Sequence, residues 1–142
     1  MRALRSITAA LALCIAGCGQ EAATSVEIAY HELEPIEARE RSIAALESGF
    51  NVICVKRVIR APDSCRDLAA ELARAGSHLT LRVTARQTAE NCTPGEAVYA
   101  YTARLGGLRP GRYELQVVHS VEGSASSPSI VMEHPIVVLD RP

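Results

Sequence analysis

Cysteine and histidine are the residues of this 142-residue chain with the most specific chemistry, and the chain has five of the first and four of the second. The cysteines are Cys14, Cys18, Cys54, Cys65 and Cys92. The histidines are His31, His78, His119 and His134. A cysteine can form a disulfide, bind a metal, act as a nucleophile or carry a lipid. The histidines lack the spacing of metal ligands and no residues supply a nucleophile beside a base, so the sequence predicts no metal site, no cofactor and no enzyme.

The first seventeen residues have the layout of a secretory signal. Arg2 and Arg5 form a basic start, an apolar run follows, and the small residues Ala16 and Gly17 come last. The apolar run is about half as long as a membrane-spanning helix must be. We therefore expect a cleaved signal at residues 1–17 rather than a permanent transmembrane helix.

The tetrapeptide "IAGC", which ends at Cys18, resembles the lipobox of bacterial lipoproteins. In that family the cysteine becomes the first residue of the mature chain and carries acyl chains. Cys14 fits the pattern badly because Leu13 before it is not small, so Cys14 would leave with the signal. Gly19, rather than an aspartate, follows Cys18, so the resemblance implies a lipid-anchored protein of the outer membrane that faces the periplasm. Two or more acyl chains hold a protein stably on a membrane without a spanning segment.

The remainder of the chain is long enough for one domain. Residues 18–25 are small and polar, which predicts a lipidated N-terminus and tether, and residues 26–142 form the predicted domain. The chain has no tryptophan and one phenylalanine, so its core must consist of aliphatic residues and a few tyrosines. Its net charge is −1 and loss of the signal removes two arginines, so a basic surface for nucleic acid is not expected.

Alternation of apolar and polar residues predicts that this domain is mainly β. The predicted strands lie within residues 24–35, 50–60, 77–88, 97–105, 112–121 and 129–140. Pro135 cannot donate a hydrogen bond to a sheet, so we expect the last strand to lie at an edge or to contain a bulge.

Two other segments have helical features. The stretch from about Ile36 to Ser48 has an apolar repeat at Ile36, Ile43 and Phe50, and we expect a short helix there. Residues 66–73 are rich in helix-forming residues but also alternate in polarity, so both a helix and a strand remain possible.

The stretch "LRPGRYELQVV" resembles the tyrosine corner of immunoglobulin-like and fibronectin-type sandwiches. The resemblance assigns the corner to Tyr113, whose hydroxyl would bond to the backbone, with Leu108 beside it. The chain from Cys54 to Val118 also resembles exported bacterial immunoglobulin-like modules, through Cys65, "AGS", "HLTLRV", Cys92 and "YTARLGGLRPGRYELQV". The resemblance implies an immunoglobulin- or fibronectin-type β-sandwich, and it favours a strand over residues 66–73. With the helical features described above, we expect such a sandwich with one or two short helices.

A lipid on Cys18 leaves three cysteines in an oxidising compartment. If residues 66–73 and 78–87 form a hairpin, Cys65 and Cys92 fall near its open end, and they are the favoured disulfide pair. If residues 64–74 are helical instead, Cys92 should lie nearer Cys54, and the alternative pair is Cys54 and Cys92. A leftover Cys54 would be a small buried hydrophobic residue rather than a nucleophile.

The sequence does not name an activity, and two functions remain open. The first is a membrane-tethered module that binds an envelope protein or has a structural role. The second is an inhibitor of secreted proteases, acting through the loops at 89–96 and 121–129. The acidic run from Glu27 to Glu40 is either a solvated face or a docking surface for a basic partner.

Overall fold

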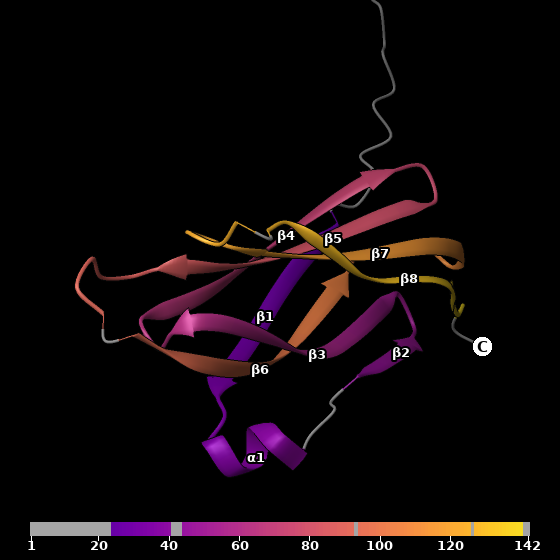
Figure 1. Cartoon of the computed structure of the whole chain (residues 1–142). Helices are drawn as coiled ribbons and strands as arrows, with labels where there is room; N and C mark the ends of the chain where they lie inside the picture. Colours follow the sequence, from indigo (N-terminus) through magenta and orange to yellow (C-terminus); the bar gives the residue numbers. More distant parts are fainter. Residues whose placement is uncertain (1–23, 41–43, 93, 126, 141–142) are drawn as a thin grey trace, which may run out of the picture.

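Strands account for nearly all of the regular structure (Figure 1). The computed structural model describes residues 24–40, 44–92, 94–125 and 127–140. Its elements are β1 (Ser25–Glu32), α1 (Pro35–Glu40), β2 (Ala45–Gly49), β3 (Val52–Asp63), β4 (Arg66–Ala75), β5 (His78–Gln87), β6 (Pro94–Gly106), β7 (Gly111–Val121) and β8 (Ser129–Val138). None of the helices in these residues is long and apolar enough to cross a membrane. The predicted signal and the lipid-bearing Cys18 lie outside the described residues.

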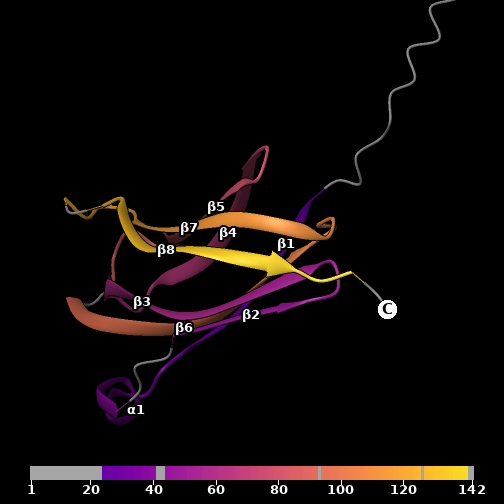
Figure 2. The ribbon, with the colours of Figure 1, turned by 90° about the vertical axis from the view of Figure 1, so that its right-hand side faces the viewer.

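The strands form two four-stranded sheets that face each other as a β-sandwich, which confirms the predicted fold class (Figure 2). One sheet has the order β1-β6-β3-β2 and the other has the order β4-β5-β7-β8. Neighbouring strands are antiparallel except β5 and β7, which run parallel. The chain reaches this arrangement by crossing between the sheets after β3, β5 and β6. The immunoglobulin type itself stays a prediction.

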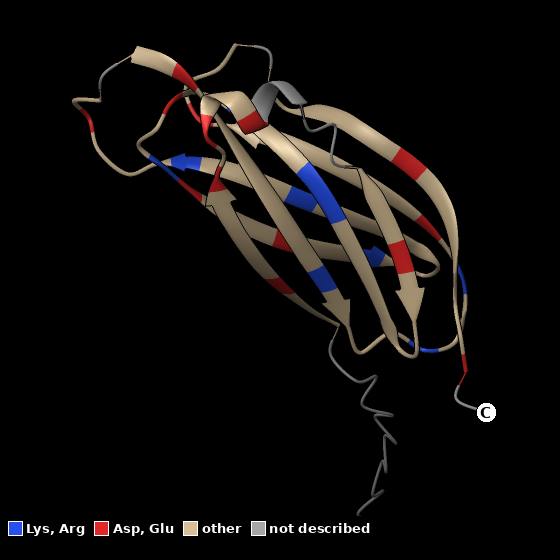
Figure 3. Ribbon diagram, turned by 90° about the horizontal axis from the view of Figure 1, so that it is seen from below, with Lys and Arg blue, Asp and Glu red and all other residues tan. Residues whose placement is uncertain are grey.

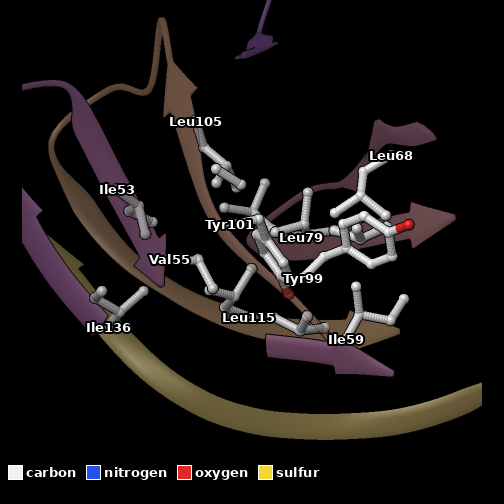
Figure 4. Close-up of a cluster of buried hydrophobic side chains, with 14 of the residues drawn as sticks. Ile53, Val55, Ile59, Leu68, Leu79, Tyr99, Tyr101, Leu105, Leu115 and Ile136 are labelled. Carbon is white, nitrogen blue, oxygen red and sulfur yellow. The ribbon is translucent and has the colours of Figure 1, made fainter. Parts of the chain in front are cut away.

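The core lies between the sheets because each strand turns its alternate apolar residues inward. In β5, the buried residues are Leu79, Leu81, Val83 and Ala85, and the residues between them are half-buried or exposed. The opposite sheet contributes buried residues from β3 and β6, including Ile53, Val55, Ile59, Tyr99, Tyr101, Ala103 and Leu105. Figure 4 shows part of this core, in which labelled side chains such as Leu79 and Leu115 of one sheet and Val55 and Tyr101 of the other lie together. Branched aliphatic residues and tyrosines thus fill the core of a chain that has no tryptophan.

The predicted helix from Ile36 to Ser48 is wrong over its second half. The helix α1 has six residues, and Ala45–Gly49 forms β2, which pairs with Val52–Lys56 of β3. Asn51 supports the tight turn between them with a φ of 60°, which asparagine tolerates better than most residues. The apolar repeat suggested a helix with one buried face. In the structure, Ile36 and Phe50 are instead 74% and 48% exposed, so they do not form a buried face together.

The segment between β1 and α1 covers part of the outer face of the first sheet. Leu33 is buried there with Val98 and Ala100, and Val58 packs against them. The backbone N–H of Leu33 donates to the carbonyl of Val98 at 2.8 Å, which holds the segment to β6. This contact gives residues 31–34 a structural role that their sequence does not signal.

Residues 66–73 are strand, as the resemblance implied, within β4. Leu68 is buried and Ala70 and Leu72 pack against the core, so the alternation prevails over the helix-forming composition. The partner strand explains this outcome, because β4 pairs along its whole length with β5 through a turn at Ser77 and Gly76, whose φ is 62°. Tertiary pairing commonly overrides a modest helix propensity.

The crossing from β6 to β7 has the contacts of a tyrosine corner. The hydroxyl of Tyr113 donates to the carbonyl oxygen of Arg109 at 2.8 Å, and the ring is buried. Leu108 is 1% exposed, and its N–H donates to the carbonyl of Asn51 at 3.2 Å. The corner is therefore fixed to the turn between β2 and β3 as well as to its own backbone.

Candidate functional site

The directions of the strands divide the connecting segments between two opposite ends of the sandwich. One end, which we call the tether end after the tether predicted for residues 18–25, comprises Ser25, the turns at 49–52 and 76–77, the loop at 107–110, and Leu139. The disulfide end comprises the corner at 63–66 and the loops at 88–92 and 122–125. The register establishes this division, since Ser25 pairs with Gly106 whereas Glu32 pairs with Tyr99. Figure 3 shows acidic residues gathered near α1 and the loops of the disulfide end.

The disulfide end is held together by covalent and polar contacts between loops that are distant in sequence. Cys65 and Cys92 form a disulfide with a Cα–Cα distance of 6.0 Å, so the favoured pairing is the one in the structure. The N–H of Gln87 donates to Oε2 of Glu122 at 2.8 Å, and the N–H of Thr88 donates to the carbonyl of Cys65 at 3.0 Å. Both loops that the sequence predicted as protease-contacting segments therefore lie at this one end.

The corner between β3 and β4 is built on an ion pair between Asp63 and Arg66. Nε and Nη2 of Arg66 donate to the two carboxylate oxygens of Asp63 at 2.9 and 2.8 Å. The remaining Arg66 nitrogen, Nη1, donates to the carbonyl of Glu122 at 2.7 Å. The Arg66 guanidinium holds the pKa of the Asp63 carboxyl below its ordinary value of 3.8. One side chain thus joins the corner to the loop between β7 and β8.

A cleft of about 520 Å³ opens beside this corner, between the second half of β3 and the β7–β8 connection. It is lined by Val58, Ile59, Arg60, Ala61, Pro62, Glu96, His119, Val121, Ser124, Ser127 and Ser129. At its rim, Nη1 of Arg60 lies 2.6 Å from Oε1 of Glu96. Since β2 pairs only with Val52–Lys56, the described part of the chain supplies no strand neighbour on that side for residues 57–63. The cleft therefore runs along a free strand edge.

His119 forms the inner wall of the cleft and is 9% exposed. Its Nε2 lies 2.8 Å from the hydroxyl oxygen of Tyr101, on an interior strand of the other sheet. Burial, together with a smaller effect of the positive charge of Arg57, lowers the pKa of His119 from 6.5 to about 4. Burial likewise raises the pKa of the Tyr101 hydroxyl. At neutral pH both groups are uncharged, and they join the two sheets with a hydrogen bond.

Arg57 places a positive charge on the inner face of the free edge. It alternates with the buried residues Val55 and Ile59, and it is itself half-buried. None of the hydrogen bonds or ion pairs found in the described residues includes its guanidinium. An inward-facing charge on a free edge opposes pairing with an arbitrary apolar strand. A carboxylate on an incoming segment would match it.

The other residues that the sequence singled out are dispersed. His78 and His134 are exposed on the second sheet, and His31 is exposed on β1. Cys54 is a half-buried free thiol on β3, so the expectation of full burial is not met. Cys54 lies on the outer face of the sheet, between the inward-facing Ile53 and Val55, and the strand register places it beside Glu47 and Arg104. Within the described ranges, no three histidine, cysteine or acidic residues form a cluster that could hold a metal.

Sequence reasoning missed the Asp63–Arg66 pair and the Tyr101–His119 pair. A signal was present for the first pair, because an acid and a base three residues apart bracket Cys65 in "DSCR". The second pair had only a partial signal. His119 occupies an inward position of its strand, which calls for a hydrogen-bonding partner, but the partner depends on how the sheets are stacked.

No protein-family model, curated protein or solved structure matches the chain. The case for a function therefore rests on the geometry of the molecule. That geometry offers a braced end with a cleft and a free strand edge. Such an edge can accept an extended peptide segment through backbone hydrogen bonds.

Proposed function

We propose that the protein is a lipid-anchored protein-binding module of the bacterial envelope, attached to the outer membrane through Cys18 and facing the periplasm. The observation that carries the binding role is the position of the cleft relative to Ser25. The chain enters the domain at the tether end, whereas the cleft and the braced loops lie at the disulfide end. An anchor ahead of Ser25 would therefore turn the cleft away from the membrane.

The contacts at the disulfide end favour binding rather than catalysis. Residues fixed before binding lose less conformational entropy when a partner docks. Here the disulfide, the Asp63–Arg66 pair and the contacts of Glu122 fix both loops. His119 bonds to Tyr101 rather than to a serine or cysteine nucleophile. We infer that the partner supplies an extended segment to the edge at 57–63, with a carboxylate opposite Arg57.

Photo-crosslinking in living cells tests the binding role. A photoreactive amino acid is placed at Glu90 or Ala125, both exposed at the disulfide end, and at Ser77 as the control at the tether end. We expect the same crosslinked protein from both disulfide-end positions and none from Ser77. Arg57→Gln should weaken that crosslink and Arg82→Gln, on the exposed face of β5, should not. Equal crosslinking at all three positions would contradict the proposal.

Lipid attachment has its own test. Cys18→Ser should abolish metabolic labelling with palmitate and release the protein from the membrane fraction, whereas labelling should persist in the Cys14→Ser control. Retention of the label in Cys18→Ser would rule out this anchor.

Protease inhibition remains the second candidate, because the disulfide rigidifies the loop at 88–92 next to the loop at 122–125. A rigid exposed loop suits a protease active site. Crosslinking from Glu90 and Ala125, combined with an inhibition assay, distinguishes the two functions. Inhibition of a secreted protease that is lost on substitution of these loops, together with crosslinking to that protease, would favour the inhibitor.

A further inference from the structure

The tether end exposes three neighbouring apolar side chains. Phe50, Val137 and Leu139 are 48%, 47% and 50% exposed. Phe50 and Leu139 are bridge partners, and the N–H of Leu139 donates to the carbonyl of Gly49 at 3.3 Å. Val137 lies two residues before Leu139 on the outward side of β8, because Ile136 and Val138 face the core. Single exposed apolar residues are ordinary, but a contiguous group indicates a contact surface.

Basic residues flank this apolar group. Arg112 is the register partner of Val137 across β7 and β8, and Arg109 lies in the preceding loop; both are exposed. Asp140 is an exposed acid nearby in sequence. Apolar side chains beside arginines match a phospholipid surface, where acyl chains lie below phosphate groups.

The entry point of the chain identifies this surface as the one nearest the bilayer. Ser25 pairs with Gly106, one residue before the loop that contains Arg109. Seven residue steps separate Cys18 from Ser25, and a fully extended chain spans at most about 3.6 Å per residue, so the reach is about 25 Å. That distance is too short for the domain to turn its tether end far from an anchored Cys18.

We propose that the tether end rests on the phospholipid bilayer, with Phe50 and Leu139 in the headgroup region and Arg109 and Arg112 beside the phosphates. The proposal rests on the lipid anchor at Cys18 proposed above. It adds a fixed orientation, in which the domain contacts the membrane with one end and holds the cleft outward. A short acyl tether alone would keep the tether end near the bilayer but would not fix the tilt of the domain.

The chain contains no tryptophan, so one substitution creates a single fluorescent reporter. Full-length lipidated protein is reconstituted in vesicles of phosphatidylethanolamine and phosphatidylglycerol, with a fraction of brominated acyl chains as quencher. Phe50→Trp reports on the tether end. Ile130→Trp is the matched control, because Ile130 is 59% exposed at the opposite end of β8. Urea unfolding of each variant verifies that it is folded.

We expect the emission of Phe50→Trp to shift to shorter wavelength and to lose most of its intensity to the brominated lipid, while Ile130→Trp shows neither change. Arg109→Gln combined with Arg112→Gln should reduce the quenching of Phe50→Trp. Vesicle-bound protein in which Phe50→Trp is unquenched would overturn this orientation and leave the anchor intact. An emission shift of Phe50→Trp without quenching by the brominated lipid would indicate a contact with protein, such as a second copy of the chain. That result would also overturn the proposed orientation. Protein that fails to float with the vesicles would instead contradict the anchor.

Discussion

The hydroxyl of Tyr101 and Nε2 of His119 lie 2.8 Å apart between the two sheets, on interior strands of opposite layers. The pair places two polar atoms in a core of mainly aliphatic side chains, and each atom is the hydrogen-bond partner of the other. Among the described residues, no buried side-chain nitrogen or oxygen lacks a hydrogen-bond partner. The pair therefore helps to specify how the sheets are aligned, because another alignment would leave a polar group buried without a partner.

The stability of the domain should fall as the pH drops from 6.5 to about 4. The folded state depresses the pKa of His119 to about 4, so over this range the unfolded chain binds a proton that the folded chain does not. The expected loss is at most about 3 kcal/mol in the free energy of unfolding. Urea unfolding at a series of pH values measures it. His119→Gln should flatten the dependence, and His134→Gln, which alters an exposed histidine, should leave it unchanged.

Removal of the Tyr101 hydroxyl should destabilise the fold. Tyr101→Phe leaves Nε2 of His119 buried without its partner, at an expected cost of about 1–3 kcal/mol. Replacing both residues, as Tyr101→Phe with His119→Leu, should cost less than the sum of the two single changes. Additive costs in a double-mutant cycle would show that the hydrogen bond does not couple the sheets.

Loss of the disulfide should reduce stability more than loss of the free thiol. The bond closes a sequence separation of 27 residues, and the chain-entropy relation gives about 3–4 kcal/mol for a loop of this size. Chemical denaturation of Cys65→Ser/Cys92→Ser measures the effect, with Cys54→Ser as the single-thiol control. An equal loss in both variants would indicate that the crosslink contributes little.

The hydroxyl of Tyr113, in the tyrosine corner, should contribute to the stability of the fold. Tyr113→Phe keeps the buried ring and removes the bond to the carbonyl of Arg109, at an expected cost of about 1 kcal/mol. Tyr30→Phe, on a ring that is 40% exposed, is the matched control and should have almost no effect. Thermal unfolding of both variants compares them directly.

The Asp63–Arg66 pair should be more strongly coupled than the Arg60–Glu96 pair. The side chains of Asp63 and Arg66 are 12% and 3% exposed, whereas those of Arg60 and Glu96 are 56% and 64% exposed and screened by water. Two double-mutant cycles with Asn, Gln and Leu replacements measure the coupling. Because Arg66 depresses the pKa of Asp63, the contribution of this pair is present above pH 3.8 and lost at lower pH. The loss of stability that His119 causes and the loss that the Asp63–Arg66 pair causes therefore occur in separate pH ranges.

The local alternation of apolar and polar residues was enough to predict the strands that turn one face toward the core. β5 and β7 were recognisable because their apolar residues recur at every second position over their whole length. The edge position of Pro135 was also predictable, because proline cannot donate a backbone hydrogen bond, whereas the contact of Tyr113 with Arg109 was expected from the resemblance of "LRPGRYELQVV" to a tyrosine corner. The pairing of β7 and β8 also shifts register, since Val117 pairs with Met132 but Val118 pairs with Ile130, which agrees with the expectation of an irregular edge strand.

The features that sequence could not predict depend on contacts between distant segments. β2 was mistaken for helix because its pairing with β3, rather than its own composition, makes it a strand. The parallel neighbours β5 and β7 carry no local signal, because β6 intervenes in the sequence and lies in the other sheet. The cleft shares this origin, because it exists only where the free edge of β3 meets the loop after β7.

For the exported protein that we propose, the position of β1 has a consequence during secretion. Among the described strands β1 pairs only with β6, and four strands separate the two in sequence. A chain that leaves the translocation channel with its N-terminus first delivers β1 long before its partner. The first strand must therefore wait unpaired while β2 to β5 emerge, and an anchored start would keep this exposed segment from diffusing to other nascent chains.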